Sequence, residues 1–394
     1  MILAQIDLTT GSIPKTLLRF AFPMICGNLL QQLYNVADTL IVGRFLGSDA
    51  LGAVGSSYTL MTFLTSILLG LCMGSGALFS VCWGQRDLAR LRRQTHAAFM
   101  LIAACTVVLN AAAFLLLDAM KTLLSVPAEV WPLMRSYLFV IFFGIGGTFL
   151  YNYYASLLRA VGNSLVPLLF LAAAAVLNIA LDLVFVLVCR WGVEGAAAAT
   201  VLAQWLSGIG TAVYTLVRCP ELRARREERR ITGAMLRELL SASVLTCLQQ
   251  SVMNLGILMV QGRINSFGPV IMAAFAAAVK IDSFAYMPLQ DFGNAFSTFI
   301  AQNYGAQQPE RIRRGIRTAV LLSSVFAVCV SACVVLLAAP LLGLFLQPGE
   351  TEILQAGVTY LRIAGAFYVG IGGLFLLYGL YLSLIHISEP TRPY

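Results

Sequence analysis

The sequence predicts an all-α polytopic membrane protein. Hydrophobic residues make up 59% of the 394 residues and charged residues only 11%, whereas soluble domains contain roughly 45–50% and roughly 25%. The apolar residues form runs of about twenty or more, the length that a helix needs to cross a hydrocarbon layer of about 30 Å. The alternating pattern of a β-barrel is not present. We therefore expect the chain to lie in a lipid bilayer.

The apolar runs are expected to form about ten transmembrane helices. They cover approximately residues 17–43, 55–82, 94–117, 130–157, 165–189, 193–217, 241–265, 270–303, 317–346 and 353–382. Pro23 lies inside the first run, where it removes a backbone hydrogen bond and permits a bend. A static kink and a moving hinge both fit this residue.

The basic residues predict the orientation of the chain. Lys and Arg cluster near residues 86–93, 218–237 and 311–317, and few lie in the loops of the opposite side. Cytoplasmic loops carry an excess of Lys and Arg, so we expect a cytoplasmic N-terminus. The net charge of +8 follows from this topology, and we expect no nucleic-acid partner.

Two parallel six-helix repeats are expected, because unusual residues coincide when the sequence is shifted by about 220 residues against itself. Asn35, Gly43 and Arg44 fall on Asn254, Gly262 and Arg263. We expect an N-terminal lobe over residues 1–217, a basic cytoplasmic linker over 218–240 and a partial C-terminal lobe over 241–381.

The second repeat is expected to be incomplete. Two lobes of six helices need roughly 440 residues at this offset, and no counterparts of the fifth and sixth runs follow the tenth. Residues 382–394 are polar, unrelated to the repeat and similar to a translated sequencing adapter. We expect these residues to be a non-native tail.

The first run carries a stripe of polar residues. Asn28, Gln31, Gln32, Asn35 and Asp38 recur every three or four residues and share one helical face. A carboxylate at the bilayer centre costs roughly 2.5–3.5 kcal/mol, so an acid there is a functional candidate. The stripe is expected to line a wet cavity. Alternatively, its amides join helices through hydrogen bonds, which leaves the acid unexplained.

The fifth run contains Asn178 and Asp182, one turn apart in an otherwise apolar helix. Two acids that face one cavity without a basic partner favour protonation, because desolvation and mutual repulsion disfavour the charged forms. Oxygen atoms of Asp38, Asn178 and Asp182 can instead bind Na⁺. The sequence favours H⁺ slightly and leaves both ions open.

The second repeat offers a different set of polar residues. Gln250 and Asn254 lie in the seventh run, and Lys280, Asp282 and Asp291 lie in the eighth. Lys280 and Asp282 are two residues apart and do not face each other on a helix. Lys280 can pair with an acid, bind an anionic part of a substrate or belong to a structural charge network.

The sequence predicts no enzyme and no cofactor. It contains no phosphate-binding GxxxxGK[ST] loop, no HExxH motif and no Ser/His/Asp set. The nine cysteines show no CxxC or CxxH spacing, so no metal other than Na⁺ is expected.

Three stretches of the sequence resemble the multidrug and toxic compound extrusion (MATE) family. They are residues 11–15 (GSIPK), 22–44 (FPMICGNLLQQLYNVADTLIVGR) and 291–305 (DFGNAFSTFIAQNYG). The resemblance covers residues 11 to about 381 and implies two six-helix lobes that alternate access to a central cavity. Within this family, the sequence is similar to the DinF-like prokaryotic branch, in which the cation site lies in the N-terminal lobe. The positions that match this site are Asp38, Tyr137, Asn152, Asn178, Asp182 and Thr200.

The resemblance and the residues together predict a secondary antiporter. We expect export of organic, cationic, drug-like compounds in exchange for H⁺ or Na⁺ by a monomer in a bacterial inner membrane. Two alternatives remain. A lipid or lipid-linked saccharide flippase needs an extended basic patch in its cavity, and a non-coupled channel or scaffold needs no intramembrane acids.

Overall fold

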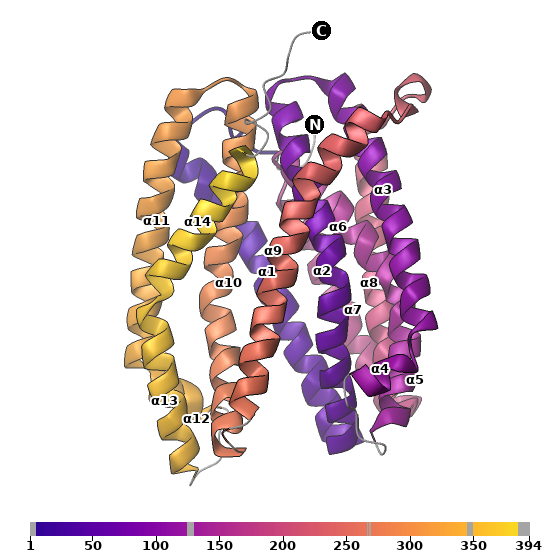
Figure 1. The fold of residues 1–394 in the computed structure, drawn as a ribbon, viewed down its shortest axis with the longest axis vertical. Coiled ribbons are helices and arrows are strands. Elements are labelled where there is room, and N and C mark those ends of the chain that lie inside the picture. Colours follow the sequence, from indigo (N-terminus) through magenta and orange to yellow (C-terminus); the bar gives the residue numbers. More distant parts are fainter. Residues whose placement is uncertain (1–4, 124–129, 266, 268, 345–349, 385–394) are drawn as a thin grey trace. The chain divides into compact units, whose positions relative to one another are not determined.

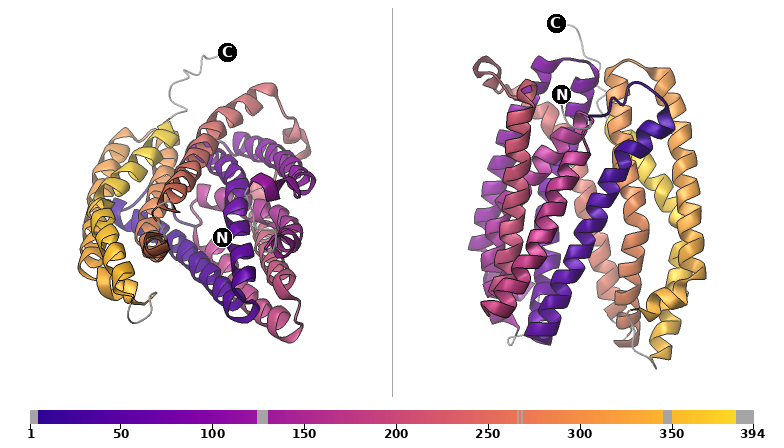
Figure 2. Two further views of the ribbon diagram at one scale, coloured as in Figure 1. Left: turned by 60° about the horizontal axis from the view of Figure 1, so that its bottom comes forward. Right: turned by 180° about the vertical axis from the view of Figure 1, so that it is seen from behind.

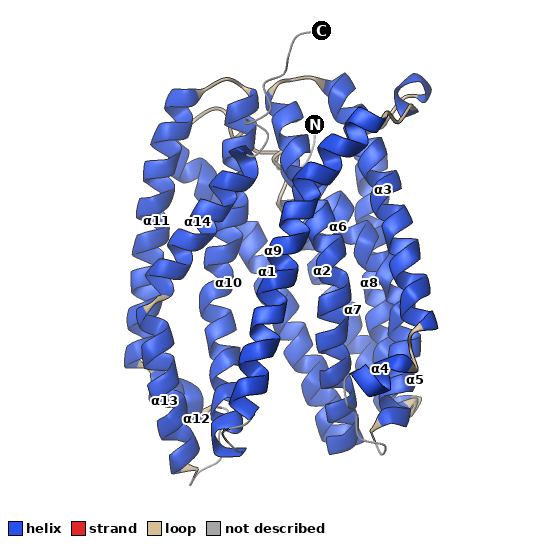
Figure 3. Ribbon diagram, in the orientation of Figure 1, coloured by secondary structure: helices blue, strands red, loops and turns tan. Residues whose placement is uncertain are grey.

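The computed structural model describes residues 5–123, 130–265, 267, 269–344 and 350–384. All regular secondary structure in these ranges is helical, which confirms the predicted fold class (Figure 3). The helices are α1 (Ile13–Leu46), α2 (Ser48–Gly84), α3 (Leu88–Leu115), α4 (Ala119–Leu123), α5 (Trp131–Ile141), α6 (Ile145–Ala160), α7 (Leu165–Asp182), α8 (Gly192–Arg218), α9 (Gly233–Asn265), α10 (Pro269–Gly305), α11 (Pro309–Leu336), α12 (Ala338–Gly343), α13 (Thr351–Ala366) and α14 (Tyr368–Leu384). Figure 1 labels them in chain order.

Short irregular helices connect some of these elements. The 3₁₀ segment η1 (Phe142–Gly144) joins α5 to α6, and the π-helix η2 (Leu183–Val188) continues α7. Two further 3₁₀ turns, η3 (Pro220–Leu222) and η4 (Arg226–Arg229), lie in the linker before α9. Single π-turns inside helices are frequent at functional sites, which draws attention to the end of α7.

Each predicted apolar run coincides with helical structure, but two runs are broken. Within the described residues, six segments are long and apolar enough to cross a membrane, and α13 with α14 forms a seventh that is bent by 47°. The expected single helix over 317–346 was wrong, because the chain breaks at Leu337 between α11 and α12. Pro340 has no backbone N–H for the carbonyl of Leu336, so α11 does not continue.

The first three residues of the expected non-native tail are helical. Leu382–Leu384 are the last residues of α14. Residues 385–394 of the expected tail lie outside the described residues.

The described chain forms two compact units. The first contains residues up to Ile6 and Cys26–Ser251, and the second contains Asp7–Ile25 and the residues from Val252 onward. Both α1 and α9 contribute to each unit. In α1 the division falls next to Pro23, which lies inside the helix as expected.

Close contact between α6 and α8 holds the first unit together. A Cβ atom on Gly208 would lie 2.5 Å from the Gly147 carbonyl oxygen, and one on Gly147 would lie 2.8 Å from the Gln204 carbonyl carbon. Glycine at both positions lets the two backbones touch, as small residues do at helix interfaces in membranes. This packing fixes the spacing between the two helices.

In the second unit, α10 packs against α11, α13 and α14. In Figure 1 and Figure 2, α13 and α14 follow one another as one bent column. Arg311 at the start of α11 fastens the segment before α1. Its guanidinium donates hydrogen bonds to the carbonyl oxygens of Leu8, Thr10 and Gly11 at 2.6–3.2 Å. The backbone carbonyls of this segment are therefore satisfied by side chains.

The glycine contact between α6 and α8 generates a stability prediction. Gly208→Ala places a methyl group against a backbone oxygen that cannot rotate away, so we expect the free energy of unfolding to fall by about 1–3 kcal/mol. Gly256→Ala is the matched control, because no atom lies within 4 Å of the added Cβ. We expect its melting temperature in detergent to equal or exceed that of the parent protein. Equal melting temperatures for the two variants would contradict the packing argument.

Candidate functional site

A cavity of about 290 Å³ lies inside the first unit. We call it the acidic cavity. Its walls come from α1, α2, α5, α6, α7 and α8. They are formed by Gln31, Tyr34, Asn35, Asp38, Tyr58, Met61, Thr62, Thr65, Tyr137, Ile141, Thr148, Tyr151, Asn152, Leu171, Ala174, Ala175, Asn178, Thr200, Ala203, Gln204 and Ser207. Among these described residues, no side chain is basic, so the negative charge of the cavity has no fixed counterion.

Five of the six predicted cation-coupling residues line the acidic cavity. They are Asp38, Tyr137, Asn152, Asn178 and Thr200. The sixth residue, Asp182, lies fully buried at the end of α7, where the π-helix η2 begins. Its carboxyl group is within hydrogen-bond range of the Asp38 carboxyl group. The structure therefore brings all six residues together.

Three of the four oxygens of this carboxyl pair have no hydrogen-bond donor among the described residues. They are both oxygens of Asp182 and Oδ1 of Asp38. Ionised carboxylates only accept hydrogen bonds, so two of them cannot satisfy each other. A proton held between them would provide the missing hydrogen-bond donor, and a bound cation would provide the missing positive charge. This pair is the chemical centre of the acidic cavity.

Amide and hydroxyl groups surround the carboxyl pair. Asn178 donates from Nδ2 to Oγ1 of Thr200 at 3.3 Å, and its own Oδ1 is buried without a donor. Asn152 donates from Nδ2 to the backbone oxygen of Thr148 at 2.9 Å, which leaves its Oδ1 as an acceptor. The buried hydroxyl of Tyr137 lies near both carboxyl groups. Oxygen acceptors therefore outnumber donors around this site.

Only part of the polar stripe on α1 faces the acidic cavity. Gln31, Asn35 and Asp38 line it at positions i, i+4 and i+7. Asn28 and Gln32 were expected on the same surface, but they are not among the residues that line the cavity. Gln32 instead accepts a hydrogen bond from Nδ2 of Asn35 at 3.4 Å. Only about one residue per helical turn of α1 points into the cavity, so the amides on either side of that line make contacts elsewhere.

Several cavity residues were not anticipated from the sequence. Tyr58, Thr62 and Thr65 line the cavity from α2 at positions i, i+4 and i+7. Tyr34 and Tyr151 add two further aromatic rings. The spacing on α2 is a detectable signal, but hydroxyl residues are common inside membrane helices and do not stand out as an acid does.

The candidates on α9 and α10 have other surroundings. Gln250 contacts Sδ of Met73 at 3.7 Å within the first unit, and Asn254 belongs to the second unit. Asp282 accepts a hydrogen bond from the Tyr368 hydroxyl at 2.7 Å. Lys280 is exposed and Asp291 is buried. Over the described residues of the second unit, Lys280 forms no ion pair, so the expected charge network does not include it.

The described residues contain no group of three or more His, Cys, Asp or Glu side chains suited to a metal ion. The nine cysteines are free thiols. The candidate site therefore consists of two carboxyl groups with neutral oxygen and nitrogen neighbours.

Long apolar helices around an acidic cavity fit a multi-pass membrane transporter. Residues 23–184 and 242–384 match the MatE family, so the chain belongs to this family of multidrug efflux transporters. It is a transporter and not an enzyme.

Related proteins agree with this assignment. The chain is 31% identical over 307 residues to the probable multidrug resistance protein YpnP of Bacillus subtilis, an alignment that covers 78% of this chain and 68% of that protein. It is 27% identical over 347 residues to the probable multidrug resistance protein YoeA of the same organism, covering 86% and 75%. The fold is similar to a solved MOP superfamily transporter from Pyrococcus furiosus, with a TM-score of 0.90, 21% identity, and coverage of 96% and 84%.

The buried carboxyl pair leads to a prediction about the melting temperature of the protein. Asp182→Asn keeps the shape of the side chain and removes a buried charge that has no basic partner, so the protein should become more stable. We expect the melting temperature in detergent at neutral pH to rise by about 2 °C or more.

Asp118→Asn is the matched control for this measurement. Asp118 is exposed and its 2.8 Å ion pair with Arg135 is also exposed, so its replacement should change stability little. A melting temperature of Asp182→Asn at or below that of the parent protein would argue against an uncompensated carboxyl pair.

Proposed function

We propose that this protein is a secondary active antiporter that exports organic, drug-like cations in exchange for H⁺ or Na⁺. The carboxyl pair of Asp38 and Asp182 is the proposed coupling site. The observation that carries the proposal is the contact between these two carboxyl groups beside a cavity whose lining, in the described residues, holds no basic side chain.

The proposed exchange follows from charge neutralisation. A buried carboxylate without a partner is costly, so a proton or a cation must neutralise the pair in each stable state. A coupling ion and a cationic substrate compete for the same negative charge. Each therefore lowers the affinity for the other, and this reciprocal coupling is what an antiporter needs.

H⁺ is the favoured coupling ion in this proposal. The two carboxyl groups lie close enough to share one proton. Na⁺ remains the alternative, because Asn178, Asn152, Tyr137 and Thr200 offer further oxygen atoms around the pair. With either coupling ion, we propose that the protein needs no cofactor.

An organic cation fits the chemistry of the cavity wall. Four tyrosine rings line the acidic cavity, from Tyr34, Tyr58, Tyr137 and Tyr151. Aromatic faces attract cations through their quadrupole, and they also offer apolar contact. The names of the Bacillus subtilis relatives as probable multidrug resistance proteins support a substrate of this class.

The membrane supplies enough energy for this exchange. One charge that moves through 100 mV yields about 2.3 kcal/mol, which supports roughly fifty-fold accumulation. The distribution of Lys and Arg supports a cytoplasmic N-terminus in a bacterial inner membrane. We propose that the protein functions there as a monomer.

The proposal predicts the phenotype of a single carboxyl variant. Asp182→Asn should abolish coupled transport, because an amide cannot exchange a proton and carries no charge to attract a cation. The measurement is efflux of the cationic dye ethidium from cells that lack their own exporters. Efflux should fall to the level of cells without the protein.

Asp118→Asn provides the control for this assay, because it makes the same chemical change at an exposed ion pair. It should retain the efflux of the parent protein at equal membrane abundance. Parent-level efflux by Asp182→Asn would disprove the role of the pair. No dye movement by a folded, membrane-inserted parent protein would instead favour the flippase alternative.

A further inference from the structure

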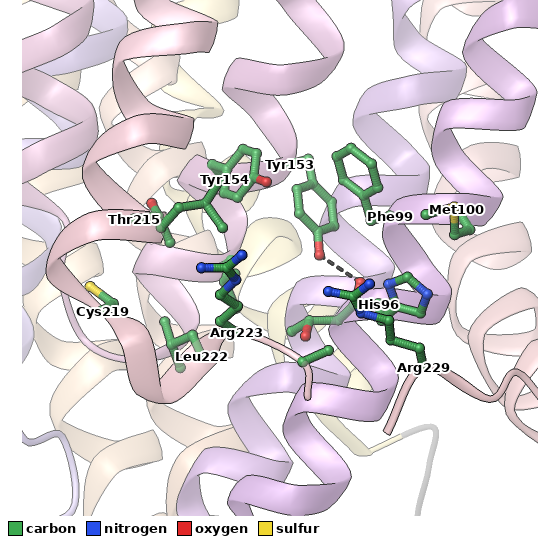
Figure 4. A pocket seen from close by; sticks show the side chains of 14 residues that line it. His96, Phe99, Met100, Tyr153, Tyr154, Thr215, Cys219, Leu222, Arg223 and Arg229 are labelled. Carbon is green, nitrogen blue, oxygen red and sulfur yellow. Dashed lines mark hydrogen bonds between the residues drawn. The ribbon is translucent and has the colours of Figure 1, made fainter. Parts of the chain in front are cut away.

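A second cavity, of about 430 Å³, lies in the first unit between α3, α6, α8 and the linker that follows α8. We call it the linker cavity (Figure 4). Both α3 and α8 pack on α6, and η3 contacts both α3 and α8 at one end. The linker therefore covers one end of the cavity, and α6 forms the wall between α3 and α8. The proposed transport function makes no use of this cavity.

Aromatic and apolar side chains form part of the lining of the linker cavity. The ring of Tyr153 packs against Phe99 at 5.2 Å and against Tyr154 at 5.0 Å between centroids. Met100 on α3 and Leu216 on α8 also line the cavity, and each is 45% exposed. Both residues lie in segments apolar enough to cross a membrane, so this part of the cavity suits contact with a lipid chain.

The linker end of the cavity is basic. Arg223 and Arg229 line it together with His96, and Figure 4 shows both arginine side chains directed into the cavity. In the described part of the chain, no carboxylate pairs with either arginine. Two guanidinium groups beside an apolar groove thus lack a protein anion. Arginine forks match the geometry of a phosphate group.

An ion pair on the other side of the linker holds these arginines in place. Arg92 on α3 binds the Glu228 carboxylate through Nε and Nη2 at 2.7–3.0 Å and also donates to the Glu221 carbonyl oxygen at 3.4 Å. Such two-pronged pairs fix orientation as well as charge. Glu228 is adjacent to Arg229 in sequence, and its negative charge is already neutralised by Arg92. The cavity is thereby left with the unpaired arginines.

We infer that the linker cavity binds an anionic phospholipid, whose phosphate lies between Arg223 and Arg229 and whose acyl chain follows Phe99, Met100 and Leu216. A positive-inside topology requires basic residues in the linker but does not require that they line an apolar, lipid-facing cavity. Basic pockets between membrane helices are a recurrent way to bind acidic headgroups. The combination of an apolar wall with two guanidinium groups fits an amphiphile better than a free anion.

The test is native mass spectrometry of the detergent-solubilised full chain titrated with dihexanoyl phosphatidylglycerol. We expect a saturable adduct of one lipid, and weaker binding of dihexanoyl phosphatidylcholine, whose headgroup has no net charge. Arg223→Gln with Arg229→Gln should weaken phosphatidylglycerol binding about tenfold or more, because both positive charges that attract the phosphate are removed.

Arg226→Gln with Arg230→Gln is the matched control, because it removes two charges from the same linker at residues that do not line the cavity. It should bind phosphatidylglycerol as the parent does. Equal weakening by both double variants would overturn the site and leave only general charge attraction. Equally tight binding of glycerol phosphate alone would overturn the lipid assignment in favour of a soluble phosphate compound.

A Met100→Trp variant that fills the groove should weaken the lipid adduct without a change in charge.

Discussion

The structure of the first unit depends on one costly arrangement, the burial of two facing carboxyl groups without a basic partner. Asp182 is fully buried, and neither of its carboxylate oxygens has a donor. In an apolar protein this costs several kcal/mol unless a proton or cation is present. The surrounding helices do not relieve this cost. Asn178 uses its donor on Thr200, and Asn152 uses its donor on the backbone of its own helix. Such a pair suits the uptake of a proton or cation, as the proposed antiport requires.

The packing around the pair keeps this site in one shape. The glycine contact between Gly147 and Gly208 sets the distance between α6, which carries Asn152, and α8, which carries Thr200. The π-helix η2 begins directly after Asp182 and changes the direction in which the following side chains point. Close packing with little free volume makes such a region resist continuous deformation.

The sequence alone was informative about the fold and about the acids, and less so about the details. Long apolar runs and rare intramembrane carboxylates are strong signals, so the helices and both Asp38 and Asp182 were found. Helical periodicity cannot say which helices meet, so the contact between α1 and α7 came from the family resemblance and not from spacing. Asn28 and Gln32 belong to the polar face of α1 but do not line the acidic cavity, because one polar helical face is wider than the cavity it lines. Arg223 and Arg229 were attributed to topology alone, because their placement in a cavity depends on the Arg92–Glu228 ion pair, which joins residues distant in sequence.

The most direct test of the central claim is ion-driven transport in proteoliposomes that contain the purified protein. Uptake of a cationic dye would be followed with a proton gradient and a sodium gradient applied separately, for the parent protein and for Asp38→Asn and Asp182→Asn. The account predicts uptake under one gradient alone, H⁺ in the favoured version, and loss of that uptake in both variants. Equal uptake by the parent and the variants, or uptake that needs neither gradient, would contradict coupling through the carboxyl pair.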